Sequence, residues 1–143
     1  MNIWINGCFD ILHTGHIDLL WFAKLYETKE LSYPEAIKKN HLYVGIDVDE
    51  RVKMLKGNDR PINDVYDRIK VLSNLKMVDS VVIFHNDDEL EYFIKTFEID
   101  YLIIGDDYND KRIIGAEFTK YGVVYYPKNG KSTTDIINKI KKI

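Results

Sequence analysis

The chain has 143 residues, of which 45% are hydrophobic and 30% are charged, and its formal net charge at pH 7 is -3. This balance predicts one compact domain, residues 1–143, and argues against a broad surface for nucleic acid. No apolar run reaches the roughly 18–20 residues that span a bilayer, so we expect a cytoplasmic protein without a membrane partner. A single cysteine, Cys8, excludes an internal disulfide and a cysteine-based metal cluster.

Strand-like and helix-like segments alternate along the chain. Short runs rich in β-branched or aromatic residues predict strands, and longer runs with apolar residues three and four apart predict helices. In chain order we expect a strand at 2–6, a helix at 15–26, strand 41–47, helix 64–75, strand 80–84, helix 87–97, strands 101–104 and 123–126, and helix 133–140. This alternation predicts an α/β domain with a parallel five-stranded sheet flanked by helices. Ligands in such sheets bind at the carboxyl ends of the strands.

Residues 27–40 form a long connection between the first helix and the second strand. Within this connection, Ser32 or Pro34 favours the start of a short helix that runs towards Lys39. We interpret residues 27–40 as a possible insertion, which leaves open a dimer contact, a lid or a segment without a role in the site.

The segment NGCFDILHTGH, residues 6–16, leaves the first strand and enters the first helix. Free backbone N–H groups and the helix dipole favour an anion at such a helix start. His13 and His16 stand three residues apart, so both imidazoles can point towards the same phosphate, with Gly15 keeping the space between them open. The pattern indicates a triphosphate site, although two polar residues capping an ordinary helix would give the same letters.

This segment resembles the signature of the cytidylyltransferase-like nucleotidyltransferases, which implies a Rossmann-like fold. The His-x-Gly-His element is also similar to one in class I aminoacyl-tRNA synthetases, but a synthetase needs a far longer chain. The sequence KSTTDII at 131–137 is similar to the closing motif of the nucleotidyltransferases. The resemblance implies catalytic roles for His13 and His16. It implies nucleotide binding by Gly7, Cys8, Phe9, Asp10 and Gly15.

A basic, turn-rich segment follows the second strand at 51–63. It would let Lys53, Lys56 and Arg60 approach substrate and triphosphate oxygens, with Lys56 as the strongest candidate for a catalytic role. We interpret the segment as a flexible arm, with a solvated charged helix that has a Gly-Pro exit as the alternative.

Arg68, within the next predicted helix, fits the family's pattern of Arg-Pro-x-Asn followed by a further arginine. The resemblance implies that Arg68 contacts a phosphate, and the alternative is an ordinary surface residue.

Two later segments complete the expected site. Gly105, Asp106 and Asp107 follow the fourth strand, where a similar segment of the family binds the nucleotide; the two aspartates could instead cap a helix. Ser132 and Thr133 open the last helix, and we expect a second anion-binding helix start that faces the first one.

The resemblance implies transfer of a nucleoside monophosphate from ATP or CTP to a phosphorylated sugar or polyol, with release of pyrophosphate. It also implies Mg²⁺ bound with the triphosphate, no metal site made by protein residues and a possible homodimer. Residues 56–63, 77–82 and 130–134 look more like heptose 1-phosphate adenylyltransferases than like glycerol 3-phosphate cytidylyltransferases. The pair Asp106-Asp107 is more familiar from the second group, so both remain open. A nucleotide-binding regulator without catalysis is a further alternative.

Overall fold

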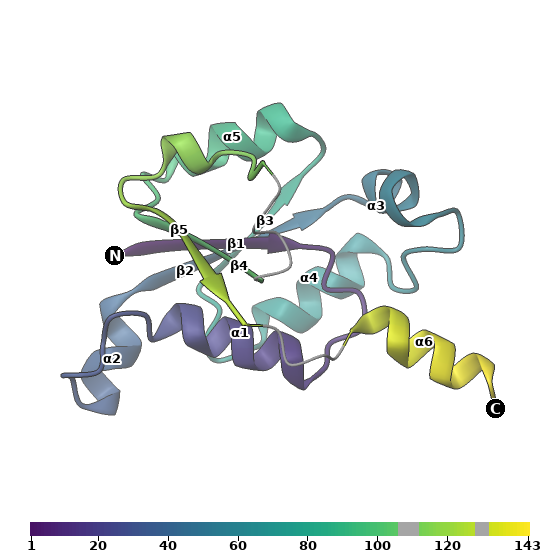
Figure 1. Ribbon diagram of the computed structural model, residues 1–143, viewed down its shortest axis with the longest axis horizontal. Helices are drawn as coiled ribbons and strands as arrows, with labels where there is room; N and C mark the ends of the chain where they lie inside the picture. Colours follow the sequence, from purple (N-terminus) through teal and green to yellow (C-terminus); the bar gives the residue numbers. More distant parts are fainter. Residues whose placement is uncertain (106–111, 128–131) are drawn as a thin grey trace.

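Five parallel strands form one sheet in the part of the chain that this computed structural model describes, residues 1–105, 112–127 and 132–143. The strands are β1 (Asn2–Gly7), β2 (His41–Asp47), β3 (Ser80–Phe84), β4 (Tyr101–Gly105) and β5 (Gly122–Tyr126). Their order is β3-β2-β1-β4-β5, so the chain runs outward from β1 and then returns to its other side (Figure 1). The topological switch point therefore lies between β1 and β4. The predicted α/β fold is confirmed, and each predicted strand agrees within one residue.

Helices pack on both faces of this sheet (Figure 1). They are α1 (Thr14–Lys24), α2 (Tyr33–Lys39), α3 (Asp49–Lys56), α4 (Val65–Ser73), α5 (Asp87–Thr96), the short 3-10 helix η2 (Ala116–Phe118) and α6 (Thr133–Lys141). The helices predicted from the apolar spacing are confirmed, and so is the short helix that ends at Lys39. None of the helices in the described residues is long and apolar enough to cross a membrane.

Part of the segment expected as a flexible arm at 51–63 is helical. The first part of that segment belongs to α3, which is anchored by the buried side chain of Val52. Lys53 and Lys56 lie in the last turn of α3, where the helix dipole favours positive charge. Gly57 then ends the helix with a φ of 108°, a conformation that favours glycine. The charged helix with a glycine exit is thus present at 51–57, and the movement of this segment over the site stays a prediction.

The sheet is buried on both faces, which explains why its strands are so apolar. Ile3 and Ile5 of β1 belong to the core cluster shared with α1 and α4, whereas Trp4 points to the opposite face and packs with α5. A Cβ atom at Gly45 of β2 would lie 2.3 Å from the Trp4 ring. Glycine at this position therefore leaves the room that the indole occupies.

A buried lysine links α1 to the start of β2. The Nζ of Lys24 donates to a carboxylate oxygen of Asp79 at 2.5 Å and to the carbonyl oxygen of Asn40 at 2.6 Å. The same Asp79 oxygen accepts from the backbone N–H of Leu42 at 2.8 Å. The Asn40 side chain donates to the carbonyl oxygens of Lys24 and Tyr26, so it closes the connection at 27–40 onto the end of α1.

We predict that Asp79→Ala lowers the free energy of unfolding by about 2 kcal/mol, because it leaves the buried Lys24 ammonium without its counterion. Urea unfolding would measure the change. The matched control is Glu117→Ala, which removes an exposed partner of Arg112 and should cost less than about 0.5 kcal/mol. Equal losses in the two variants would contradict a special role for the buried pair.

Candidate functional site

A cavity of about 470 Å³ opens at the carboxyl ends of β1, β2 and β4. It lies at the switch point of the sheet, where an α/β fold is expected to bind its ligand. Most of the residues predicted for the site line this cavity: Gly7, Cys8, Phe9, Asp10, His13, Gly15, His16, Lys56, Gly105, Ser132 and Thr133. Segments from the two ends of the chain therefore meet in one place.

The two histidines lie side by side at the start of α1. His13 is the N-cap residue, and its Nδ1 accepts from the backbone N–H of Gly15 at 3.1 Å. Its ring stacks on that of His16 with a centroid distance of 3.9 Å, and the centroid of the Phe9 ring lies 5.2 Å from that of His16. Because Nδ1 of His13 is an acceptor, the neutral ring carries its proton on Nε2. Both imidazoles line the same cavity, and their contact with one phosphate stays a prediction.

The start of α6 is fastened to the loop that precedes α1. The Oγ1 of Thr133 donates to the carbonyl oxygen of Ile11 at 3.1 Å, and Oγ of Ser132 accepts from the N–H of Asp135 at 3.0 Å. The predicted N-cap at Ser132 is thus confirmed. Both helix starts line the same cavity, and the positive end of each helix dipole favours an anion there.

Asp10 connects the loop after β1 to the loop before α4. One of its carboxylate oxygens accepts from the N–H of Ile62 and the other from the N–H of Asn63, each at 2.8 Å. The Asn63 side chain donates back to the Asp10 carbonyl oxygen, and Nε of Arg60 lies 3.4 Å from the carboxylate. Asp10 therefore borders the cavity while both of its carboxylate oxygens are bonded within the protein.

Arg68 is buried, so the interpretation as an ordinary surface residue is wrong. Its guanidinium donates to the carbonyl oxygen of Cys8 at 2.9 Å, to that of Asn63 at 3.1 Å and to the carboxylate of Asp49 at 2.7 Å. Positions 65, 68 and 72 share the buried face of α4. That spacing was the signal that could have predicted an internal position for this arginine.

Three predicted phosphate-binding residues, Lys53, Arg60 and Arg68, do not line the cavity, and their contact with a phosphate stays a prediction. Asp106 and Asp107 lie outside the described residues. Several lining residues were not predicted at all; they include Asp47, Arg51, Leu55, Leu90, Arg112, Ile113, Ile114, Tyr126 and Thr134. Asp47 was the easiest to find, because it is an acidic residue at the end of a predicted strand.

Two cavity residues have shifted pKa values. Burial raises the pKa of the Cys8 thiol, and the opposing effect of nearby Lys56 and Arg68 does not cancel it. Burial also raises the pKa of the Asp47 carboxyl, although Arg51, Arg68 and Lys56 all act to lower it. Burial thus favours the neutral form of both groups, and the nearby cations favour the ionised form of both.

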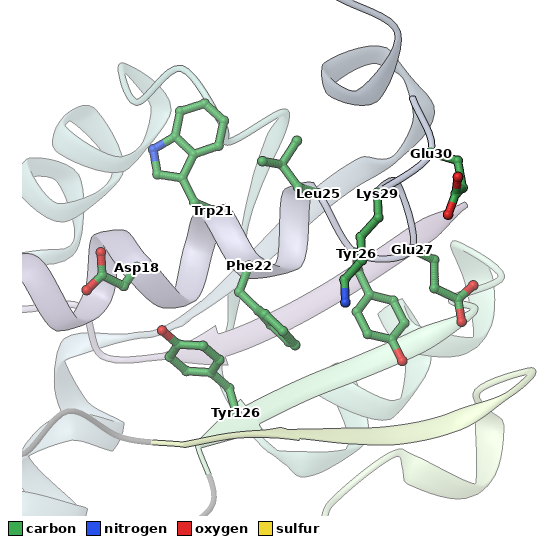
Figure 2. Close-up of a pocket in the computed structure, with 9 residues that line it drawn as sticks. All are labelled: Asp18, Trp21, Phe22, Leu25, Tyr26, Glu27, Lys29, Glu30 and Tyr126. Carbon is green, nitrogen blue, oxygen red and sulfur yellow. The ribbon is translucent and has the colours of Figure 1, made fainter. Parts of the chain in front are cut away.

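A second, larger hollow of about 760 Å³ lies along α1 (Figure 2). Trp21 and Phe22 of α1 line it together with Tyr26, just after that helix, and Tyr126 of β5. Its lining also includes acidic side chains such as Glu27. No predicted site residue lines this hollow among those that the structure describes. It lacks the histidines and helix starts of the smaller cavity, so size does not identify the site here.

Comparison with known proteins agrees with the predicted family. A family model described as cytidylyltransferase-like matches residues 4–139. The bifunctional protein HldE of Campylobacter fetus is 44% identical over 141 residues, which is 97% of this chain and 28% of that protein. The bifunctional protein HldE of Nitratiruptor sp. is 41% identical over 139 residues, 97% of this chain and 27% of that protein. The chain therefore spans little more than a quarter of the length of these relatives.

A solved structure has a similar fold. The lipopolysaccharide core biosynthesis protein from Thermoplasma volcanium superposes with a TM-score of 0.62 over 90% of this chain and 97% of that chain. Its sequence identity is 24%, so this likeness concerns the fold alone.

We predict that Asp10→Ala lowers the free energy of unfolding by about 2 kcal/mol, because the N–H groups of Ile62 and Asn63 lose their acceptor, the buried Asp10 carboxylate. Denaturant unfolding would measure this loss. The matched control is Asp59→Ala, an exposed aspartate of the same connection, which should change stability by less than about 0.5 kcal/mol. An Asp10→Ala protein as stable as the control would show that the hydrogen bonds of the Asp10 carboxylate do not stabilise the fold.

Proposed function

The chain belongs to the cytidylyltransferase-like family of nucleotidyltransferases, and we propose that it transfers an adenylyl group from ATP to a D-glycero-heptose 1-phosphate, releasing pyrophosphate. One observation carries the proposal. His13 and His16 meet the starts of α1 and α6 in a single cavity at the switch point of the sheet. Two helix starts and two stacked imidazoles suit a polyphosphate chain that gains negative charge during reaction.

The proposed reaction is a direct displacement. A phosphate oxygen of the acceptor attacks the α-phosphorus of the nucleotide, the bond from that phosphorus to the oxygen bridging the β-phosphorus breaks, and pyrophosphate leaves. Catalysis then comes from positioning and charge neutralisation. His13, with its proton on Nε2, and His16 donate hydrogen bonds to the phosphate oxygens, and Lys56 neutralises charge at the exposed end of α3.

Nucleotidyltransferases of this family generally use a divalent metal ion with the nucleotide. The described residues contain no group of three or more histidine, cysteine or acidic side chains that could hold a metal ion. When bound with the nucleotide, Mg²⁺ would supply positive charge to the phosphate groups. No step of the proposed reaction is assigned to the ion.

The choice of acceptor and base rests on sequence. Residues 56–63, 77–82 and 130–134 resemble heptose 1-phosphate adenylyltransferases, and the similarity to HldE proteins over nearly the whole chain supports the same choice. Glycerol 3-phosphate cytidylyltransferase is the second candidate, because the pair Asp106-Asp107 is more familiar from that group. The test must therefore compare both nucleotides and both acceptors.

Pyrophosphate release should be measured with ATP and CTP, each offered heptose 1-phosphate or glycerol 3-phosphate together with Mg²⁺. Release only with ATP and the heptose is the expected result. Release with CTP and glycerol 3-phosphate would replace the adenylyltransferase proposal by the second candidate. No release in any of the four mixtures would overturn both and favour a nucleotide-binding protein without this chemistry.

We predict that His16→Ala lowers kcat by about 10²–10³-fold, the usual scale for one lost donor to a developing charge. The protein should remain folded, which circular dichroism would check. His85→Ala is the matched control, because this exposed histidine pairs with Glu89 and does not line the cavity. A folded His16→Ala enzyme with the kcat of the control would contradict the proposed role.

A further inference from the structure

The cavity contains a carboxylate that the proposed displacement does not use. Asp47 is the last residue of β2, where it lies next to Phe84 of β3, and its side chain is 12% exposed. One carboxylate oxygen accepts from Nε of Arg51 at 2.7 Å. Among the hydrogen bonds of the described residues, none involves the other carboxylate oxygen of Asp47. Asp47 also lines the cavity. A ligand could therefore use that oxygen.

Arg51 holds this carboxylate in a fixed position. Beyond its bond to Asp47, its Nη2 donates to the Asp87 carboxylate at 2.8 Å, and its guanidinium lies 5.4 Å from the centroid of the Phe84 ring. A guanidinium held on three sides loses little further freedom when a ligand binds. The positive charge of Arg51 also favours the ionised form of Asp47, against the effect of its burial.

The cavity has two chemically different ends. Beyond β1, on the side of β4, its walls include Ile104, Ile113 and Ile114, a surface that suits a flat and largely apolar base. On the side of β2, the walls carry Asp47, Arg51 and the cationic Lys56. A carboxylate repels a triphosphate but accepts readily from neutral hydroxyl groups. The β2 end therefore suits a ligand with one phosphate and several hydroxyl groups.

We propose that Asp47, held by Arg51, accepts hydrogen bonds from hydroxyl groups of the sugar phosphate acceptor and selects polyhydroxylated acceptors over smaller ones. This inference rests on the proposed function, because it assigns the β2 end of the cavity to the acceptor of that reaction. Asp47 is thus a specificity-determining residue, distinct from the histidines and helix starts that bind the nucleotide phosphates. Its contribution should appear in acceptor binding rather than in nucleotide binding.

The test compares Asp47→Ala and the more conservative Asp47→Asn with the unchanged protein, using steady-state rates with ATP, Mg²⁺ and heptose 1-phosphate. The matched control is Asp88→Asn, which changes an exposed aspartate outside the cavity. We expect Asp47→Ala to raise the KM for the heptose about 10–100-fold, the scale for lost hydrogen bonds to a charged group. The KM for ATP should change less than about threefold, and Asp47→Asn should have a smaller effect on the heptose.

A second measurement separates recognition from a structural role. The ratio of kcat/KM for heptose 1-phosphate to that for glycerol 3-phosphate should fall in Asp47→Ala, because the smaller acceptor offers fewer hydroxyl groups. Unequal loss of activity towards the two acceptors is the result that a general loosening of the cavity would not produce.

The outcomes distinguish this inference from the proposed function. If the unchanged protein is inactive with every acceptor, the proposed function fails, and the inference fails with it. If the unchanged protein is active but folded Asp47 variants keep the heptose KM and the acceptor ratio, the inference alone is overturned. A rise in the KM for ATP with an unchanged heptose KM would also overturn it, because that result would place the ribose of the nucleotide against Asp47.

Discussion

The site depends on a buried positive charge beneath its first loop. The Arg68 guanidinium donates to the carbonyl oxygens of Cys8 and Asn63 and to the Asp49 carboxylate. These bonds join three segments that are far apart in the sequence: the loop after β1, the start of α3 and the loop before α4. A buried guanidinium is stable only when its donors are satisfied, so its partners must adopt this arrangement when the chain folds. The Asp10 carboxylate, in the loop after β1, joins two of these segments a second time, because it accepts from N–H groups in the loop before α4.

The parallel sheet explains why the functional groups converge. All five described strands end at the same edge, and the chain leaves β1 on one side and returns to it on the other. The crevice beside β1 therefore receives the start of α1, the end of β2 and the start of α6, with Thr133 bonded to the loop at Ile11. The proposed division into a nucleotide end and an acceptor end follows from the different side chains that β2 and β4 bring to this edge.

Local patterns predicted most of the fold and part of the site. The strands and the helix N-cap at Ser132 follow from short-range chemistry, so the prediction and the structure agree there. The helix at 51–56 was only the second interpretation of that segment, because the burial of Val52 depends on packing that the charged residues around it conceal. Arg68 was hard to assign for the opposite reason, since an arginine on a helix is usually exposed and only its partners on other segments make burial favourable.

The sequence by itself determined the order of strands and helices, the loop with His13 and His16, and the family to which these residues point, because periodicity and turn chemistry act between neighbours in the chain. Tertiary structure alone decided that Asp10 and Arg68 fasten loops, and that Asp47 and Arg51 share a cavity with the histidines. Those roles depend on distances and burial between residues that lie tens of positions apart, and an aspartate or arginine has the same letter whether it faces a ligand, a backbone N–H group or water.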